Sequence, residues 1–116
     1  MDKKVTIQIR NFEPWQETAE MMADVGFKYV AMGFGDEKPL LKDDWKDHVY
    51  KMAEVFDKCG LKCVQTHAPY YDLLISAEKR DENMEKALLR SMEATKILGA
   101  AICAVQPRSY IIDGAP

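Results

Sequence analysis

Apolar and polar positions along the chain repeat one pattern three times: a helix with one apolar stripe, a single glycine and an apolar strand. The glycines are Gly26, Gly60 and Gly99, and successive ones lie 34 and 39 residues apart. Glycine readily takes the left-handed conformation that ends many helices. The spacing is close to the length of one strand-helix unit with its loops. With an opening strand, the pattern predicts the order β-α-β-α-β-α-β in a single domain, residues 1–116.

Apolar residues at helical spacing predict three amphipathic helices. The first begins near Pro14, the second follows Asp43 and Asp44, and the third begins near Asp81. The residues expected to face the core are Trp15, Ala19, Met22 and Ala23, then Trp45, Val49, Met52, Ala53 and Phe56, then Met84, Leu88, Leu89, Met92, Thr95 and Leu98. His48 is expected on the solvated side of the second helix.

The strand patterns distinguish two parallel-sheet architectures. Strands that alternate with helices form a parallel sheet. In an open doubly wound sheet, helices cover both faces and the strands are apolar on both sides. Here residues 5–10 alternate, with Gln8 and Arg10 on one face, and Cys63, Gln65 and His67 are expected to share a face of the third strand. We therefore expect an α/β fold that is half of a (β/α)8 TIM barrel. Dimerisation is one way to complete such a barrel. The alternative is a small open doubly wound sheet.

A family resemblance appears at the end of the third strand. Residues 63–74 read Cys-Val-Gln-Thr-His-Ala-Pro-Tyr-Tyr-Asp-Leu-Leu. With the first strand and the helix-glycine-strand junctions, this segment resembles the N-terminal half of the sugar phosphate isomerase/epimerase superfamily, the xylose isomerase-like barrels related to endonuclease IV. The resemblance implies metal-assisted proton transfer next to the carbonyl of a sugar or sugar phosphate. The strands that carry most of that chemistry are absent, so the single chain is expected to be incomplete and its standing as an enzyme stays open.

The candidate site residues lie at the ends of the strands. By resemblance His67 is the catalytic candidate, as a substrate-positioning group or a metal ligand. Arg10, Asn11, Gln106 and Tyr70 are candidates for binding a sugar or sugar phosphate. An ion pair inside the barrel explains Arg10 equally well, and Gln106 can instead be structural. The family also implies a divalent metal (Mn, Mg, Co or Zn), which this chain does not support by itself.

Two other functions remain as alternatives. One is a non-catalytic half-barrel, or a truncated fragment, that acts as a structural or assembly module. The other is an endonuclease IV-like AP endonuclease, which is disfavoured because Gln106 stands where that pattern has a histidine. The net charge of −3, from 16 basic and 19 acidic residues, also argues against a nucleic-acid partner.

Composition adds expectations about the protein's environment and assembly. The 116 residues are 47% hydrophobic and 30% charged, as in globular proteins. No leader or membrane span is recognisable, so we expect a cytoplasmic protein. The unpaired strand edges of a half-barrel predict a homo-oligomer, with a homodimer as the simplest form. Cys59, Cys63 and Cys103 are an odd number without a Cys-x-x-Cys pair, so we expect reduced core thiols.

Overall fold

The computed structural model describes residues 6–71, 78 and 81–105 of the chain. The three predicted helices and four predicted strands are present, and a single short turn of helix, α2, is an addition to the predicted order. The elements in order are β1 (Thr6–Arg10), α1 (Trp15–Val25), β2 (Tyr29–Gly33), α2 (Lys38–Leu41), α3 (Trp45–Lys58), β3 (Lys62–His67), α4 (Glu82–Ile97) and β4 (Ile102–Ala104).

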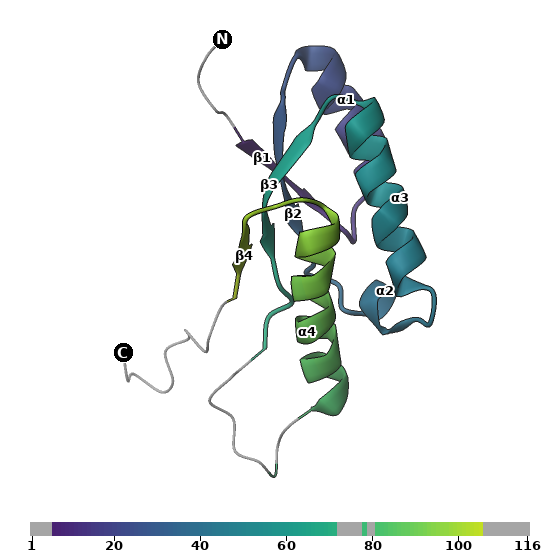
Figure 1. Ribbon diagram of the computed structural model, residues 1–116, viewed down its shortest axis with the longest axis vertical. Helices are drawn as coiled ribbons and strands as arrows, with labels where there is room; N and C mark the ends of the chain where they lie inside the picture. Colours follow the sequence, from purple (N-terminus) through teal and green to yellow (C-terminus); the bar gives the residue numbers. More distant parts are fainter. Residues whose placement is uncertain (1–5, 72–77, 79–80, 106–116) are drawn as a thin grey trace, which may run out of the picture.

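The four strands form one parallel sheet whose order, β1-β2-β3-β4, follows the sequence. Figure 1 shows the strands on the left of the view and the helices gathered on the right. Within the helical layer, α3 packs against both α1 and α4. The fold is therefore α/β with an all-parallel sheet, as predicted. None of the helices in the described ranges combines the length and hydropathy needed to cross a lipid bilayer.

Each long helix turns into the next strand at a glycine with positive φ. The φ angle is 103° at Gly26, 69° at Gly60 and 76° at Gly99. At the end of α1, the Gly26 N–H donates to the carbonyls of Met22 and Ala23. An L side chain is strained at these angles, which explains why the chain uses glycine at all three junctions. The repeat read from the sequence is confirmed.

The hydrophobic core fills the space between the sheet and the helices. Ile9, Val30 and Met32 from the strands are fully buried there. Each such side chain contributes about 1.5–3 kcal/mol relative to an exposed position. For α1 and α3 the predicted core stripes are largely confirmed, because the buried helix residues are Ala19, Met22, Trp45, Val49, Met52, Val55 and Phe56.

The predicted core face of α4 is partly wrong. Leu88 and Thr95 are buried as expected, but Leu89 is 65% exposed and Met92 is 41% exposed. The helix instead buries a face of small residues, Ala87, Ser91 and Ala94 among them. Small side chains let the helix approach the strands closely, so its large apolar residues fall on a neighbouring face. Periodicity of large residues alone could not reveal this.

A buried hydrogen bond joins α4 to the middle of the sheet. The hydroxyls of Thr66 on β3 and Thr95 on α4 lie 2.6 Å apart, and both residues are almost completely buried. The Thr95 hydroxyl also donates to the Ser91 carbonyl at 2.7 Å. Because buried polar groups are costly without partners, this bond fixes the position of α4 on β3.

Removing one partner of this pair should cost more than removing both. We expect Thr95→Val to lower the free energy of unfolding by about 1–3 kcal/mol, since Thr66 is left with an unsatisfied buried hydroxyl. Adding Thr66→Val should recover part of that loss, because valine has a similar shape and no polar group. Urea denaturation of the two single variants and the double variant measures the coupling. Strictly additive losses would show that the hydroxyls do not depend on each other.

Cys63 lies on the opposite face of β3 from the one predicted. Val30 of β2 pairs with Cys63, but the next residue, Ala31, pairs with Gln65, so Val64 is an extra residue in the strand. Such a bulge reverses the alternation of side chains. Cys63 therefore joins the core, where burial raises the pKa of its thiol, while Gln65 and His67 face the other way. All three cysteines are free, and Cys59 and Cys103 are half-buried.

His48 is not the solvated residue that the sequence predicts. Its ring meets Trp15 of α1 edge-on, with 6.0 Å between ring centroids, and its Nε2 is buried without a hydrogen-bond partner in the described part of the chain. Burial, helped by the charge of Lys42, lowers the pKa of His48, and Asp44 acts in the opposite direction. The imidazole therefore belongs to the packing between α1 and α3.

The lowered pKa of His48 predicts a loss of stability at mildly acidic pH. The unfolded chain binds this proton more readily than the folded chain. Stability should therefore fall as pH drops through the ordinary histidine pKa of about 6.5 toward the lower folded value. Urea midpoints measured between about pH 8 and pH 5 should decline less for His48→Phe than for the unchanged protein. His67→Gln is the matched control and should keep the decline; an identical pH profile for His48→Phe would contradict the assignment.

Candidate functional site

The carboxyl ends of the four strands form one row across the sheet. The register aligns Arg10 with Gly33, Gly33 with His67, and His67 with Ala104. Neighbouring strands are about 4.8 Å apart, so Arg10 and His67 lie about 10 Å from each other across Gly33. Alternation places the three side chains of this row on the face opposite Ile9, Met32 and Thr66, whose side chains enter the core.

Gly33 provides the space in which the polar side chains of β1 gather. A Cβ built on Gly33 would lie 2.8 Å from Nε2 of Gln8 and 3.7 Å from Cγ of Arg10. Both side chains therefore lean over the glycine toward the middle of the sheet. The φ angle of Gly33 is not in the left-handed region, so its role is the missing side chain and not a special backbone conformation.

His67 is positioned by its backbone and by Gln65. Its carbonyl accepts from the N–H of Phe34 at 2.8 Å, which ties the end of β3 to the loop after β2. Nε2 of Gln65 lies 3.3 Å from Nε2 of His67. An amide nitrogen donates, so this contact forms a hydrogen bond when the imidazole tautomer leaves Nε2 free to accept. His67 is half-buried.

Arg10 carries the positive charge of this row, and it is already paired. Its Nη1 lies 3.2 Å from Oε1 of Glu13, and the side chains are 50% and 36% exposed. An exposed pair of this kind contributes little stability and exchanges readily. The guanidinium can therefore turn from Glu13 to an anionic ligand at small cost. The pair differs from the ion pair inside a barrel that the sequence suggests for Arg10, because Glu13 lies in the loop after β1 and both side chains are partly exposed.

The other predicted site residues have separate locations. Asn11 is buried and its amide bridges two loops: Nδ2 donates to the Asp36 carbonyl at 2.8 Å, and Oδ1 accepts from the Asp36 N–H at 3.0 Å. Tyr70 is 47% exposed in the loop after β3. Gln106 lies outside the described residues. Of the predicted set, only Arg10 and His67 share the row at the strand ends.

The neighbouring tyrosine, Tyr71, has a structural role. It is buried, its hydroxyl donates to Oε2 of Glu85 at 3.0 Å, and it accepts from the N–H of Asp81 at 3.0 Å. The carboxylate of Asp81 in turn caps the first turn of α4. Of the two tyrosines after His67, Tyr70 is therefore exposed and Tyr71 holds the start of α4 in place through hydrogen bonds.

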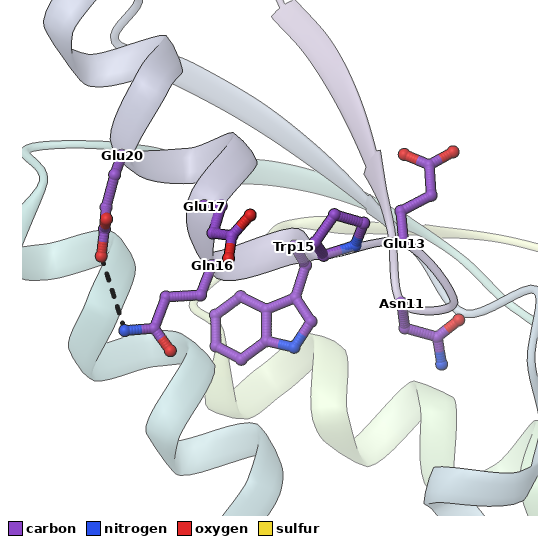
Figure 2. Close-up of a pocket in the computed structure, with 7 residues that line it drawn as sticks. Asn11, Glu13, Trp15, Gln16, Glu17 and Glu20 are labelled. Carbon is purple, nitrogen blue, oxygen red and sulfur yellow. Dashed lines mark hydrogen bonds between the residues drawn. The ribbon is translucent and has the colours of Figure 1, made fainter.

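An open pocket of about 550 Å³ lies beside this row at the beginning of α1. Figure 2 shows its polar lining, where Gln16 donates to Glu20 at 3.5 Å and Glu13 and Glu17 add carboxylates. Three carboxylates repel a phosphate, and His67 does not line the pocket. We therefore place the candidate site on the open face of the sheet and not in this pocket.

The described side chains of the row do not fit a divalent metal. In residues 6–71, 78 and 81–105, no three His, Cys, Asp or Glu side chains come close enough to hold one. The side chain in contact with His67 is the neutral amide of Gln65, and one imidazole with one amide is a poor ligand set for a divalent ion. The donors suit hydroxyl groups and an anion instead.

Gln8 and Gln65 are the two residues of the cluster that were absent from the predicted site. Their signal was the alternation itself, which puts Gln8 on the same face as Arg10 and Gln65 on the same face as His67. What the sequence could not show is that Ala31 lies between them in register and that the Gln8 side chain reaches over Gly33. We call Gln8, Arg10, Gln65 and His67 the strand-end cluster, in which Gly33 lies between Arg10 and His67.

Filling the space over Gly33 should disturb the cluster without unfolding the protein. In Gly33→Ala the new methyl group would displace the end of the flexible Gln8 side chain, and the backbone angles remain accessible to alanine. We expect the free energy of unfolding to stay within about 1 kcal/mol of the original. The side-chain amide resonances of Gln8 should shift in NMR spectra while those of Gln16 do not. A large loss of stability would mean that the glycine serves the fold.

No family model matches the chain, and no curated protein or solved structure matches it either. A function must therefore be argued from the residues and geometry of this chain.

Proposed function

We propose that the chain is the N-terminal half of a (β/α)8 barrel of the sugar isomerase type, and that the strand-end cluster binds a sugar or sugar phosphate. The observation that carries the proposal is the row of Arg10, Gly33 and His67 at the carboxyl ends of parallel strands. In barrels of this architecture, substrates bind at that end of the strands.

The sheet supports the barrel part of the proposal. The strand order follows the sequence, so each right-handed crossover moves in the same direction along the sheet. The crossover helices α1, α3 and α4 therefore lie on one face. A doubly wound sheet reverses direction and places helices on both faces. The helix-free face, with Gln8, Arg10, Gln65 and His67, then corresponds to the interior of the barrel.

The chemistry of the cluster suits a phosphorylated polyol. Side-chain amides donate and accept together, which matches sugar hydroxyls that do the same. Arg10 offers a planar set of donors for a phosphate or carboxylate. His67 can hold a proton on one ring nitrogen and accept one on the other, so it can pass a proton to or from a bound oxygen atom.

Turnover needs groups beyond this cluster. In the described residues, the open face carries no carboxylate next to His67 and no set of metal ligands. A divalent metal would supply polarisation of a substrate carbonyl, and its ligands would have to come from other strands. We therefore propose that this half binds substrate and that isomerisation requires a complementary set of strands. A half-barrel that only assembles, without binding sugar, is the competing function.

Ligand binding can be followed at the two histidines of the chain. We expect ribose 5-phosphate to shift the imidazole resonances of His67 in NMR titrations and to leave those of His48 unchanged. A half-site on an open face should bind weakly, with a dissociation constant on the order of 1 mM. Ribose and inorganic phosphate, titrated separately, report how much each part of the ligand contributes.

Two variants sharpen this experiment. Glu13→Gln frees Arg10 from its ion pair and should tighten binding of the sugar phosphate but not of ribose, whereas Arg10→Gln should weaken only the former. Gln16→Ala, outside the cluster, is the control and should change neither. If phosphate alone reproduces the full effect, the site is a simple anion site. If His67 stays unperturbed at about 20 mM ligand, the proposed sugar binding is wrong and the assembly function gains support.

A further inference from the structure

Phe12 is an exposed aromatic residue in the loop between β1 and α1. It is 58% exposed, and it stands two positions after Arg10 of the strand-end cluster. The N–H of Glu13 donates to the Arg10 carbonyl at 3.1 Å, so Phe12 occupies a corner of a tight turn. Such corners usually hold glycine, asparagine, aspartate or serine. Neither the turn nor the hydrophobic core therefore accounts for a phenylalanine at this position.

The backbone that carries Phe12 is held in place on both sides. The N–H of Asn11 donates to the Gly33 carbonyl at 2.9 Å, and the Asn11 amide makes two hydrogen bonds to the backbone of Asp36. The turn hydrogen bond of Glu13 fixes the other side. The ring is thus carried by backbone that is ordered before any ligand binds, and this lowers the entropy cost of a contact with it.

The Phe12 ring lies on the open side of the sheet, beside the strand-end cluster. A Cβ built on Gly35 would lie 3.1 Å from Cε1 and 3.5 Å from Cδ1 of Phe12, so the ring fills the space that a side chain there would take. Phe34 is buried in the core, and its N–H extends the sheet by donating to the His67 carbonyl at 2.8 Å. Because side chains alternate along an extended chain, the space over Gly35 is on the same side as that over Gly33.

We propose that Phe12 is the surface on which the ring of a cyclic sugar phosphate rests while Arg10 holds the phosphate. The inference rests on the sugar site proposed above and adds a preference to it, for cyclic sugars over open-chain polyols. Single exposed apolar residues are common on protein surfaces. What points to a ligand here is the place of the ring, on an ordered turn and next to the polar groups of the strand-end cluster.

The shape of a sugar ring explains the preference. Its hydroxyl groups lie mainly around the rim, so its C–H groups form an apolar face. That face gains by leaving water for the flat surface of an aromatic side chain, while the rim hydroxyls remain free for the amides of Gln8 and Gln65. An open-chain polyol has no such face, and its rotatable bonds must be ordered on binding. Small-molecule sites commonly combine aromatic surface with a few polar groups in this way.

Glucose 6-phosphate and sorbitol 6-phosphate are a matched pair of ligands for the test. Both carry a phosphate on a six-carbon chain of hydroxyl groups, but only the first forms a ring. Binding of each to the full chain is followed at the imidazole resonances of His67. We expect glucose 6-phosphate to bind about fivefold more tightly, and we expect Phe12→Ala to remove the difference by weakening glucose 6-phosphate alone. Phe12→Trp keeps an aromatic surface and should retain the preference.

Further variants separate ring stacking from other effects. Phe12→Leu keeps an exposed apolar side chain without a flat ring and should lose most of the preference. Tyr50→Ala removes an aromatic side chain at a 59% exposed position of α3 and should change nothing. Inorganic phosphate should bind Phe12→Ala as well as it binds the unchanged chain, because the turn still presents Arg10. Far-UV circular dichroism checks that all variants stay folded.

The outcomes distinguish the role of Phe12 from the sugar site itself. Equal binding of the two ligands to the unchanged chain, or a preference that survives Phe12→Ala, overturns the inference and leaves the sugar site intact. If no sugar phosphate shifts the resonances of His67 at about 20 mM, both the site and the role of Phe12 are rejected.

Discussion

The structure depends on one constraint: each parallel strand is laid down next to the previous one, always in the same direction. Right-handed crossovers in such a sheet place every helix on the same face. Ile9, Val30, Met32 and Thr66 consequently enter a single core between two layers, and within the described residues no helix covers the opposite face. Polar side chains on that face are compatible with stability because they remain in contact with water, and the same accessibility lets them meet a ligand.

One irregularity in β3 serves both the core and the strand-end cluster. Without the extra residue at Val64, the alternation that aims His67 at the open face would aim Cys63 there too. The bulge lets Cys63 and Thr66 both face the helices while Gln65 and His67 both face away. Bulges near functional residues often redirect side chains in this way. Here the redirected residues are the two that contact each other at 3.3 Å.

The sequence predicted the elements better than the contacts between them. The glycine at the end of each long helix, the α1 and α3 core stripes and the parallel sheet all depend on local patterns, and these were correct. The small-residue face of α4, the packing of His48 against Trp15 and the reversal at Cys63 depend on the neighbours across space. The site shows the same division. His67 and Arg10 could be named from their places at strand ends, whereas Gln8 could not, because its relevance comes from its side chain, which reaches over Gly33 of the neighbouring strand.

Arg10, the charged group of the strand-end cluster on this polar face, is paired with Glu13. A lone guanidinium at the carboxyl ends of strands would attract any anion, and Glu13, three residues later, provides an internal competitor at 3.2 Å. Since the pair is exposed, its strength is modest and a doubly charged phosphate can displace the carboxylate. A neutral sugar gains nothing from that exchange and must rely on the amides of Gln8 and Gln65. In the proposed site the two contributions to binding would therefore be separate, and Glu13 in the loop after β1, not His67, would set the preference for phosphorylated ligands.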